Sequence, residues 1–551
     1  MIPYMLITPQ EFIKIFTFKY SLLRYLFVFS WYVILSIIIF GIYYYQLWIF
    51  AGPLGKKLWK VNLFWDINGN ISIFMGMLVF IFSYIFKSIV FKLPTVLTKE
   101  DVMEEGFKNN IAILIACHNS SDIIEETLKS IVVHFDPQHV FVCDNNKTSD
   151  MGENEIETHR LCETNGVNYN YINVPNKTNA IRTVLKEIKH HYEYVILLDD
   201  DTLMADTFCL KEDWFLKDKK LAGIGFGIRM KHTTSLLQRC VDAEYLYWSY
   251  NKHMKNFATN KFICGIGGIW KTDIIYDILS INPSDGSIFP FGEDGWNGTI
   301  SRLNGYKIRQ DMQNFVYSQC PTNLLFNSSD DCISGYDSTT LWKQRALRWY
   351  RSCNMRIIPE LYSFLTFNAS IEGDSMTKKI LRNIYYRGII TWSFVLIYYS
   401  AIMPLLLANY IFEPRLYLVI HSTLILMTII SGLFVRYIIF RNRGDCHIGF
   451  DVIFAYPFYI MYVTIMKMFG FIGTLFYYFP FKIQMRVFGR HQLITEPIDD
   501  TPTDIESDTI FYDFRSIDEI TPLSESETVF YEFESISNIS RELQMEVVVS
   551  Q

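Results

Sequence analysis

Residues 194–202 read YVILLDDDT and decide the fold class, because an apolar run of strand length ends directly in three carboxylates. The β-branched and aromatic residues of this run favour a buried strand. Three neighbouring carboxylates repel one another, and a hard divalent cation relieves this repulsion through oxygen ligands. Because alternate residues of an extended segment point to one side, Asp199 and Asp201 are expected to face a ligand together and Asp200 to point away. A solvated surface loop is the alternative.

Two more strands are expected upstream of this one. Residues 110–119 (NIAILIACHN) are apolar like a strand buried on both faces, and a helical pattern follows them. Residues 139–150 (HVFVCDNNKTSD) begin as another strand and turn polar at Asp144. A carboxylate at the C-terminal end of a strand in an open α/β sheet lies at the crevice where such folds bind ligands. An Asx-turn is the alternative role for Asp144.

Two polar motifs follow downstream. Residues 290–296 (PFGEDGW) place Glu293 and Asp294 in a turn with Gly and aromatic neighbours. Residues 343–351 (KQRALRWYR) belong to a helical pattern of mixed polarity. On this helix Gln344, Arg348 and Arg351 are expected along one side, with Trp349 beside them. A membrane-surface helix has the same composition, because Arg and Trp favour the headgroup level, and both roles stay open.

Long apolar runs near both ends of the chain indicate a membrane protein. Of 551 residues, 50% are hydrophobic and 16% aromatic, which exceeds the usual composition of a soluble protein. The runs at 26–50, 71–91, 389–412 and 417–440 each reach the ~20 residues that a membrane-spanning helix needs. The first run is too long and too aromatic for a removed signal peptide. A fifth apolar stretch, 451–481, contains Lys467, Gly470 and Gly473 and is either one tilted span or a hairpin of two short helices.

Basic residues next to these runs indicate the orientation. Clusters follow the fourth and fifth runs, and the positive-inside rule places both clusters in the cytosol: Arg436, Arg441 and Arg443, then Lys482, Arg486 and Arg490. The region between the second and third runs is then cytosolic as well, and the hairpin is favoured for 451–481. Lys56, Lys57 and Lys60, between the first two runs, do not follow the rule.

The C-terminal segment from about residue 495 is acidic, rich in Ser and Thr, and predicted to be disordered. It contains a weak repeat, residues 505–520 against residues 524–539, which suggests a docking or phosphorylation segment. A solvated acidic tail is the alternative. The whole-chain net charge of −7 averages this tail with a mixed body. The ten cysteines contain no CxxC pair, which argues against a disulfide scaffold and a structural zinc site.

In this order, the strand ending at Asp144, the DDDT, GED and QRALRW motifs and the flanking apolar runs make the chain resemble a known family. It is similar to the membrane-embedded, processive family 2 glycosyltransferases, the group of cellulose, chitin and hyaluronan synthases, and especially to fungal-type polysaccharide synthases (type 2 glycosyltransferases). The resemblance covers roughly residues 20–480. His118-Asn119-Ser120 stands where many relatives have YNE, GED where hyaluronan synthases have GDD, and QRALRW where fungal chitin synthases have QRRRW. These departures leave the sugar open.

The resemblance implies a role for each motif. Asp144, Lys177, Asp199 and Arg348 would bind the nucleotide-sugar, with Asp144 at the uracil and ribose and Arg348 at the pyrophosphate. Asp199 and Asp201, as the DxD motif, would hold Mn²⁺ or Mg²⁺. Asp294, with Glu293, would be catalytic, as the general base. Cys264, Gly265, Gln344 and Trp349 would bind the acceptor, with Gln344, Arg348 and Trp349 matching the QxxRW pattern.

The fold implied is an α/β GT-A glycosyltransferase domain with a mixed, mainly parallel sheet, inserted between transmembrane helices. The expected divisions are a membrane region (1–92), the cytosolic GT-A domain (93–340), amphipathic interface helices carrying QxxRW (341–385), three or four transmembrane helices (386–481) and the acidic tail (482–551). The expected location is integral and multi-pass, in the plasma membrane.

The function implied is inverting transfer from a UDP-sugar onto a growing β-linked polysaccharide, with export through the protein's own helices. The partners expected are the UDP-sugar donor, the polysaccharide acceptor, the lipid bilayer and a kinase or docking protein for the tail, but no nucleic acid. One alternative is a non-processive enzyme acting on a lipid-linked acceptor, which would share DxD and the base. Another is an inactive membrane scaffold.

Overall fold

The computed structural model describes residues 94–98, 100–145, 151–173, 176–282, 292–321, 323–325, 340–390 and 448–477, and short pieces between 422 and 443. The predicted spans at 26–50 and 71–91 and the acidic tail lie outside these residues. The predicted spans at 389–412 and 417–440 lie largely outside them.

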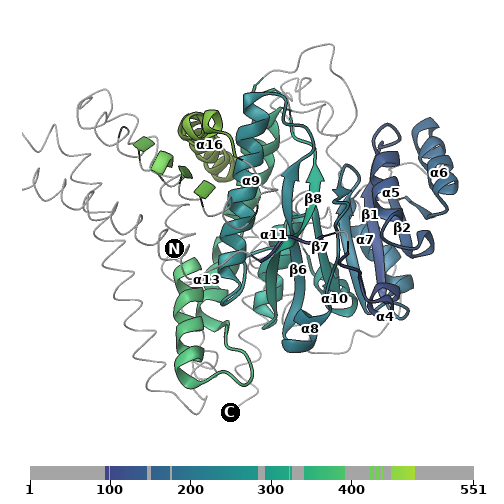
Figure 1. Ribbon diagram of the computed structural model, residues 1–551, viewed down its shortest axis with the longest axis horizontal. Helices are drawn as coiled ribbons and strands as arrows, with labels where there is room; N and C mark the ends of the chain where they lie inside the picture. The colour runs from purple at the N-terminus through teal and green to yellow at the C-terminus, as the bar shows by residue number, and fades with distance from the viewer. Residues whose placement is uncertain are drawn as a thin grey trace, which may run out of the picture. The chain divides into compact units, whose positions relative to one another are not determined.

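A mixed sheet forms the centre of the described region, with the strand order β3-β2-β1-β4-β7-β6-β8-β5 (Figure 1). Strands β1 to β4 run parallel to one another, as do β6 and β8, whereas β7 pairs antiparallel with β4 and β6, and β5 antiparallel with β8. The prediction of a mixed, mainly parallel α/β sheet is therefore confirmed. The bounds are β1 Ile111–Cys117, β2 Val140–Asn145, β3 Asn168–Ile172, β4 Tyr194–Asp199, β5 Leu203–Met204, β6 Leu221–Met230, β7 Gly267–Lys271 and β8 Lys307–Ser318.

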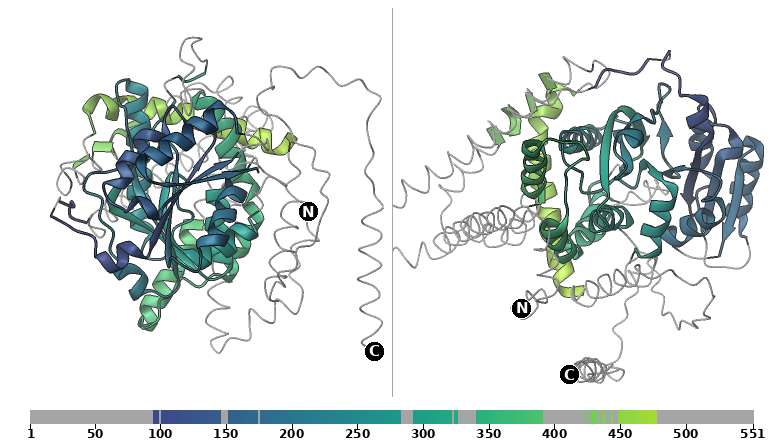
Figure 2. Two further views of the ribbon diagram at one scale, coloured as in Figure 1. Left: turned by 90° about the vertical axis from the view of Figure 1, so that its right-hand side faces the viewer. Right: turned by 90° about the horizontal axis from the view of Figure 1, so that it is seen from below.

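Strand β1 shows why the sheet is covered on both faces. All seven of its residues are buried, and alternate side chains enter two different apolar cores. Ile113 belongs to a core shared with one set of helices: α4 (Glu105–Asn109), α5 (Ile124–Val132), α6 (Glu153–Asn165), α8 (Asp213–Lys217) and α9 (Leu236–Lys255). Leu114 belongs to a core shared with α7 (Lys177–Ile188), α10 (Thr272–Ser280) and α11 (Glu293–Leu303). Helices flank the sheet on both sides in the further views (Figure 2). A strand buried on both faces needs the continuous apolar sequence found at 110–119.

The segments after the sheet pack back onto this domain. They comprise η4 (Lys343–Trp349), α12 (Tyr350–Met355), α13 (Ile357–Thr366) and a helix that begins at residue 376 and continues to residue 390. Helix α13 is fixed to α11 by a buried ion pair, in which Glu360 accepts from the Arg302 guanidinium at 2.6 Å and from the Thr299 hydroxyl at 2.8 Å. This contact fixes α13 to α11, the helix that begins with the Glu293 and Asp294 of the GED motif.

Residues 450–477 form one continuous helix, α16 (Phe450–Tyr477), so the favoured hairpin is wrong. The helix packs against α9, η4 and α12, and it lies beside α9 in Figure 1. Gly470 was expected to break the helix, but it lies at a close contact with another segment. A Cβ added at Gly470 would lie 2.6 Å from the Tyr350 Cβ and 3.1 Å from the Ala346 carbonyl oxygen. Lys467 places its ammonium 5.5 Å from the centre of the Tyr350 ring. The polar and small residues of this run therefore mark a close helix contact and not a turn.

Helix α16 has an apolar outer side as well. Within the described residues it is the one helix long and apolar enough to cross a membrane. One side packs on the domain, with the rings of Tyr247 and Tyr456 5.0 Å apart and those of Trp342 and Phe469 also 5.0 Å apart. The other side exposes apolar residues at helical spacing: Phe450, Phe454, Phe458, Met461 and Ile465. Such a two-sided distribution is also typical of a helix lying along a membrane surface.

Candidate active site

A cavity of about 560 Å³ opens beside the C-terminal ends of β1 and β4. This is the edge at which open α/β sheets bind ligands. Eight predicted site residues line it: Lys177, Asp199, Asp201, Cys264, Gly265, Glu293, Asp294 and Trp349. The fold therefore brings together five motifs that are far apart in the sequence.

Lys177 connects two of these motifs directly. It is the first residue of α7, and the preceding Asn176 caps this helix by accepting a hydrogen bond from the Asn179 amide at 3.1 Å. The Lys177 ammonium forms an ion pair with Asp199 and a second one, at 3.0 Å, with Glu293. Burial disfavours the charged form of Lys177 and lowers its pKa. The charges of Asp199 and Glu293 raise this pKa by more than burial lowers it, so the pKa of Lys177 lies well above its usual value. The cation thus bridges the DxD and GED motifs.

Asp201 has the features of a cation ligand. Its Oδ2 accepts hydrogen bonds from the Ser318 hydroxyl at 3.0 Å and the Gln319 amide at 3.2 Å. Its Oδ1 is buried and has no hydrogen-bond partner among the described residues. Burial, and then the charges of Asp199 and Asp200, raises the pKa of Asp201 to about 8. An unpaired buried oxygen between carboxylates fits a hard divalent cation.

The remaining ligands of such a cation would come from outside the acidic residues. Within the described residues, no group of three or more His, Cys, Asp and Glu side chains is placed to hold a metal. Magnesium is commonly bound by one or two carboxylates together with phosphate oxygens and water. Asp199 and Asp201 therefore fit a site that a bound diphosphate completes.

Asp200 lines the cavity too, which corrects the expectation that it points away. Strand β4 ends at Asp199, so the strand alternation used for that expectation does not extend to Asp200. The Asp200 carboxylate accepts a hydrogen bond from the Ser120 hydroxyl, and its backbone carbonyl accepts one from the Thr127 hydroxyl at 2.7 Å. Burial raises the pKa of Asp200 to about 6.

The GED motif forms the start of α11, with Gly292 in the left-handed region at a φ of 87°. A Cβ at Gly292 would collide with the Ser352 side chain, and one at Gly295 would collide with the Arg356 guanidinium. The Asp294 Oδ1 accepts a hydrogen bond from the Gly295 amide at 2.6 Å. Burial and the neighbouring Glu293 charge raise the pKa of Asp294, while the positive charge of Arg356 acts in the opposite direction. The glycines thus bring Asp294 and this guanidinium into one corner of the cavity.

Arg356 was missed by the sequence analysis. It is buried, lines the cavity, and donates to the Ser352 hydroxyl at 3.0 Å. It lies seven residues after Trp349, which is two helical turns, so its position on the helix face of the QRALRW segment was a usable signal.

Cys264 and Gly265, the motif predicted to bind the acceptor, lie in the same corner of the cavity as Asp294. A Cβ at Gly265 would lie 3.2 Å from the Glu293 Oε1 and 3.7 Å from the Asp294 Cβ, so this close approach requires a small residue. Burial raises the pKa of the adjacent Cys264 thiol to about 11, which keeps the thiol neutral near neutral pH. Trp248 on α9 and Phe262 also line the cavity and were not predicted.

The QRALRW segment is a π-helix, in which the Tyr350 amide donates to the Arg345 carbonyl, five residues back. The chain has three residues between Gln344 and Arg348, whereas the QxxRW pattern has two, so the predicted match was one residue out of register. A π-helical turn accommodates one residue more than an α-helical turn. The extra residue is therefore absorbed locally, and Trp349 still reaches the cavity.

Arg345, which was given no role from the sequence, is the inward cation of this segment. It is fully buried and forms an ion pair with Glu244 of α9, to which the Tyr459 hydroxyl of α16 also donates. Its guanidinium lies 5.8 Å from the Trp248 ring centre and 5.3 Å from that of Trp349. Three helices thus hold the two tryptophans of the cavity wall.

Three predicted residues remain, and two of them, Gln344 and Asp144, do not line the cavity. Gln344 is buried inside η4. The side chain of Arg348 lies outside the described part of the chain, so its role at a pyrophosphate stays a prediction. Asp144 is buried within β2, where its Oδ2 accepts from the Tyr169 hydroxyl at 2.8 Å and its Oδ1 has no hydrogen-bond partner among the described residues. The next residue, Asn145, does line the cavity.

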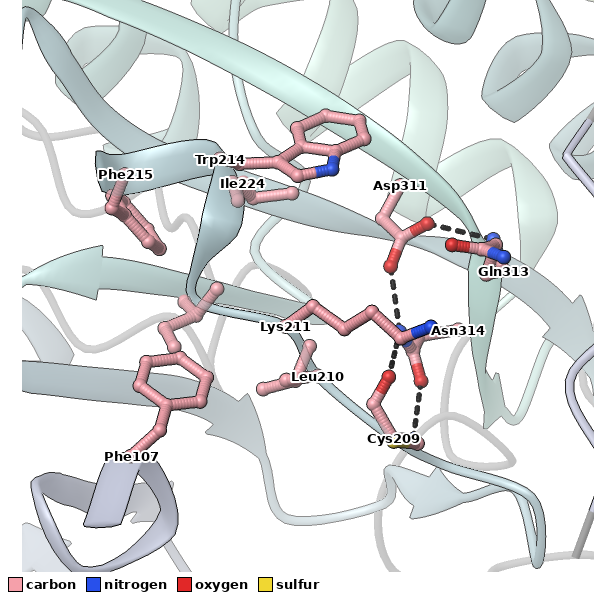
Figure 3. Close-up of a pocket in the computed structure, with 11 residues that line it drawn as sticks. Phe107, Cys209, Leu210, Lys211, Trp214, Phe215, Ile224, Asp311, Gln313 and Asn314 are labelled. Atoms are coloured by element: carbon pink, nitrogen blue, oxygen red, sulfur yellow. Dashed lines mark hydrogen bonds between the residues drawn. The ribbon is translucent and has the colours of Figure 1, made fainter. Parts of the chain in front are cut away.

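A second hollow, of about 20 Å³, shares no residue with this cavity (Figure 3). Asn314 of β8 donates to the Cys209 carbonyl at 2.9 Å and accepts from the Cys209 amide at 2.7 Å, and Asp311 accepts from Asn314 at 2.6 Å. The space has room for about one water molecule. These contacts fix the loop before α8 to the sheet and indicate a structural role.

The central part of the chain is similar to known proteins. Residues 109–351 match the family described as "Glycosyltransferase like family 2". Poly-beta-1,6-N-acetyl-D-glucosamine synthase of Staphylococcus epidermidis is 23% identical over 314 residues, which are 53% of this chain and 65% of that protein. The enzyme of the same name from Staphylococcus aureus is 21% identical over 271 residues, 46% of this chain and 57% of that protein. The match thus spans less than two thirds of the length of either relative.

Among solved structures, the mannosyltransferase PcManGT from Pyrobaculum calidifontis, in complex with GDP-Man and Mn²⁺, is similar with a TM-score of 0.43 and 12% identity. The match covers 74% of this chain and 97% of that one. Residues 109–351 are therefore similar to glycosyltransferase family 2 domains.

Proposed function

We propose that this protein is an inverting glycosyltransferase that uses a UDP-sugar to extend a β-linked polysaccharide. The observation that carries the proposal is the double ion pair of Lys177 with Asp199 and Glu293, which joins a nucleotide-site lysine, a DxD motif and a GED motif in one cavity. The polysaccharide product is supported by the relatives, whose names describe synthesis of a β-linked amino-sugar polymer.

Donor binding would use the charged floor of the cavity. Asp199 and Asp201 would hold Mn²⁺ or Mg²⁺, which when bound supplies positive charge to the departing diphosphate. Lys177 adds a fixed cation beside Asp199, and Arg348 is proposed to contact the pyrophosphate. Asp144 is proposed to contact the uridine, since its buried Oδ1 has no hydrogen-bond partner among the described residues.

The transfer step needs a base, because a sugar hydroxyl is a weak nucleophile. Asp294 is proposed to take the proton from the acceptor hydroxyl as this oxygen attacks the anomeric carbon and UDP leaves. General-base help of this kind contributes about 10²–10⁴-fold. Burial and the Glu293 charge raise the pKa of Asp294, which makes it a better proton acceptor than an exposed carboxylate.

The acceptor would lie against the aromatic wall formed by Trp248, Phe262 and Trp349. Flat rings suit the apolar faces of sugar rings. Cys264 and Gly265 border the same space and leave room for an acceptor beside Asp294. This wall favours a sugar acceptor over a purely lipidic one.

Multi-pass membrane insertion and export of the product are part of the proposal. They rest on the apolar runs at 26–50, 71–91, 389–412 and 417–440 and on the apolar outer side of α16. A polar chain cannot cross lipid unaided, because each unpaired hydroxyl would cost several kcal/mol. A docking or kinase partner for the acidic tail is proposed from its repeat alone.

A donor screen tests the proposal. Detergent-solubilised protein with Mn²⁺ or Mg²⁺ is given UDP-GlcNAc, UDP-glucose and UDP-glucuronate singly and in pairs, and UDP release and product size are followed. Turnover with one donor and a long product supports a homopolymer synthase, and turnover that needs two donors supports a copolymer synthase. Transfer of one sugar to a lipid carrier, or no turnover with any donor, contradicts the proposal. Asp213→Asn, in an exposed pair with Lys217, is the matched control for substitutions of cavity carboxylates.

A further inference from the structure

Helix α9 carries a buried lysine close to the cavity. Lys252 is only 8% exposed and lies one turn after Trp248, which lines the cavity. Its ammonium lies 4.2 Å from the centre of the Phe262 ring, and this ring lines the cavity as well. Within the described part of the chain, the ammonium has no carboxylate at ion-pair distance and no hydrogen-bond partner. Buried lysines are rarely left in this state.

The charged groups around Lys252 belong to the proposed transfer site. Burial lowers the pKa of Lys252, and the nearby Cys264 and the negative charge of Asp294 oppose this shift. Three charged groups influence the pKa of Asp294 in turn: Glu293 on α11, Arg356 between α12 and α13, and Lys252 on α9. Geometry connects Lys252 to the same helix: its ring partner Phe262 packs on α11, where a Cβ at Gly298, one turn after Asp294, would lie 2.6 Å from the Phe262 Cα.

A purely structural role does not explain this arrangement. The Phe262 ring can be covered equally well by an uncharged chain of the same length, and methionine would fill the space without burying a charge. Arg356 is already held by Ser352 and packs on Gly295. Lys252 has no such hydrogen bond among the described residues, and its ammonium lies over the ring of Phe262, which lines the cavity.

We propose that Lys252 is a positioning residue for sugar transfer, whose ammonium keeps the Asp294 carboxylate charged and directed at the acceptor hydroxyl. This inference rests on the proposed function. It adds a residue outside every motif singled out in the sequence. It predicts that loss of the charge acts on the pH range of activity and not on donor binding.

The test compares Lys252→Met, Lys252→Arg and Lys189→Met with the wild-type protein. Lys189 is a matched control, because its ammonium also lies 4.2 Å from a ring centre, that of Tyr276, but away from the cavity. UDP release is measured between about pH 5 and pH 9 with the donor that the wild type uses, and donor KM is measured alongside.

The sign of the effect follows from the charge. A cation stabilises ionised Asp294, so removing it raises the pKa of Asp294 and moves the acid limb of kcat/KM to higher pH. A rise of half a unit to one unit in the pKa of Asp294 corresponds to a roughly three- to tenfold lower kcat/KM at pH values below this pKa. At pH values well above it, kcat/KM should be near normal. Lys252→Arg and Lys189→Met are expected to keep the wild-type limb, and no variant is expected to change donor KM.

Each outcome decides the inference. An unshifted limb in Lys252→Met, with wild-type turnover elsewhere, overturns the role of Lys252 and leaves the proposed function intact. A uniform loss at all pH values that Lys252→Arg does not restore also overturns it, since that result indicates packing. If the wild type itself turns over no UDP-sugar, the proposed function and this inference both fall.

Discussion

The Lys177 ammonium lies 3.0 Å from the Glu293 carboxylate while it also contacts Asp199, so one cation joins the two acidic motifs of the cavity. Without it, two partly buried carboxylates would lose the cation that they share. Lys177→Met is therefore expected to lower kcat/KM for the UDP-sugar by roughly 10²-fold or more. UDP release checks this, with Lys186→Met on the exposed side of the same helix as control. Normal turnover by Lys177→Met would show that the bridge has no part in the reaction.

Asp201→Asn is expected to remove activity and to stabilise the metal-free protein. The folded-state pKa of Asp201, about 8, lies above the ordinary value of 3.8. Its contribution to stability is thus fully present below about pH 4 and is lost as the pH rises through 8. In EDTA at pH 8 the variant should unfold about 2 °C or more above the wild type, and near pH 4 the difference should vanish.

Added Mn²⁺ tests whether Asp201 is a metal ligand, through its effect on the unfolding temperature. It should raise the unfolding temperature of the wild type at pH 8 and leave Asp201→Asn unchanged, because binding to the folded state alone stabilises it. Equal stabilisation of both proteins would exclude Asp201 as a ligand.

The buried ion pair of Arg345 with Glu244 should matter for stability. Removing one partner leaves an unpaired buried charge, so Glu244→Leu is expected to destabilise the protein by about 3–5 kcal/mol. The double variant Glu244→Leu/Arg345→Leu should recover most of this loss. Thermal unfolding of both checks the prediction, and the exposed pair of Arg160 with Glu157 provides a control that should not change the midpoint. A double variant as unstable as the single one would contradict it.

The π-helical turn at Lys343–Trp349 predicts an unusual tolerance to deletion. Removing Leu347 should convert the turn to an α-helical one and keep Trp349 at the cavity, with turnover within about tenfold of the wild type. Removing Leu361 from the α-helical α13 should instead rotate the rest of that helix and abolish activity. Similar losses in both variants would show that the extra residue is not absorbed in this way.

The sheet was predictable because its signals are local. Residues 110–119 and 194–199 are apolar runs of strand length, and in the structure they form neighbouring parallel strands. The carboxylates that follow the second run, and the GED turn, reach one cavity because the fold places strand ends and helix starts at the same edge.

Other features depended on packing and could not be predicted from composition. Gly470 and Lys467 suggested a break in α16, but in the structure they contact residues 346–350. This contact joins segments more than a hundred residues apart, so the sequence pattern of α16 alone could not predict it. Arg356, Trp248 and Lys252 carry no motif. Only the folded helices bring Arg356 and Trp248 to the cavity and Lys252 onto the Phe262 ring of its wall. The register of Gln344 and Trp349 depended on a π-helical turn, which has no reliable sequence signal.

The most direct test of the central claim is turnover by Asp294→Asn with the donor that the wild type uses. UDP release and donor binding are measured on the same preparation. The account predicts that turnover falls by roughly 10²-fold or more while donor affinity stays within about threefold, because only the proton acceptor is removed. Wild-type turnover by Asp294→Asn would contradict the assignment of this cavity as the site of transfer.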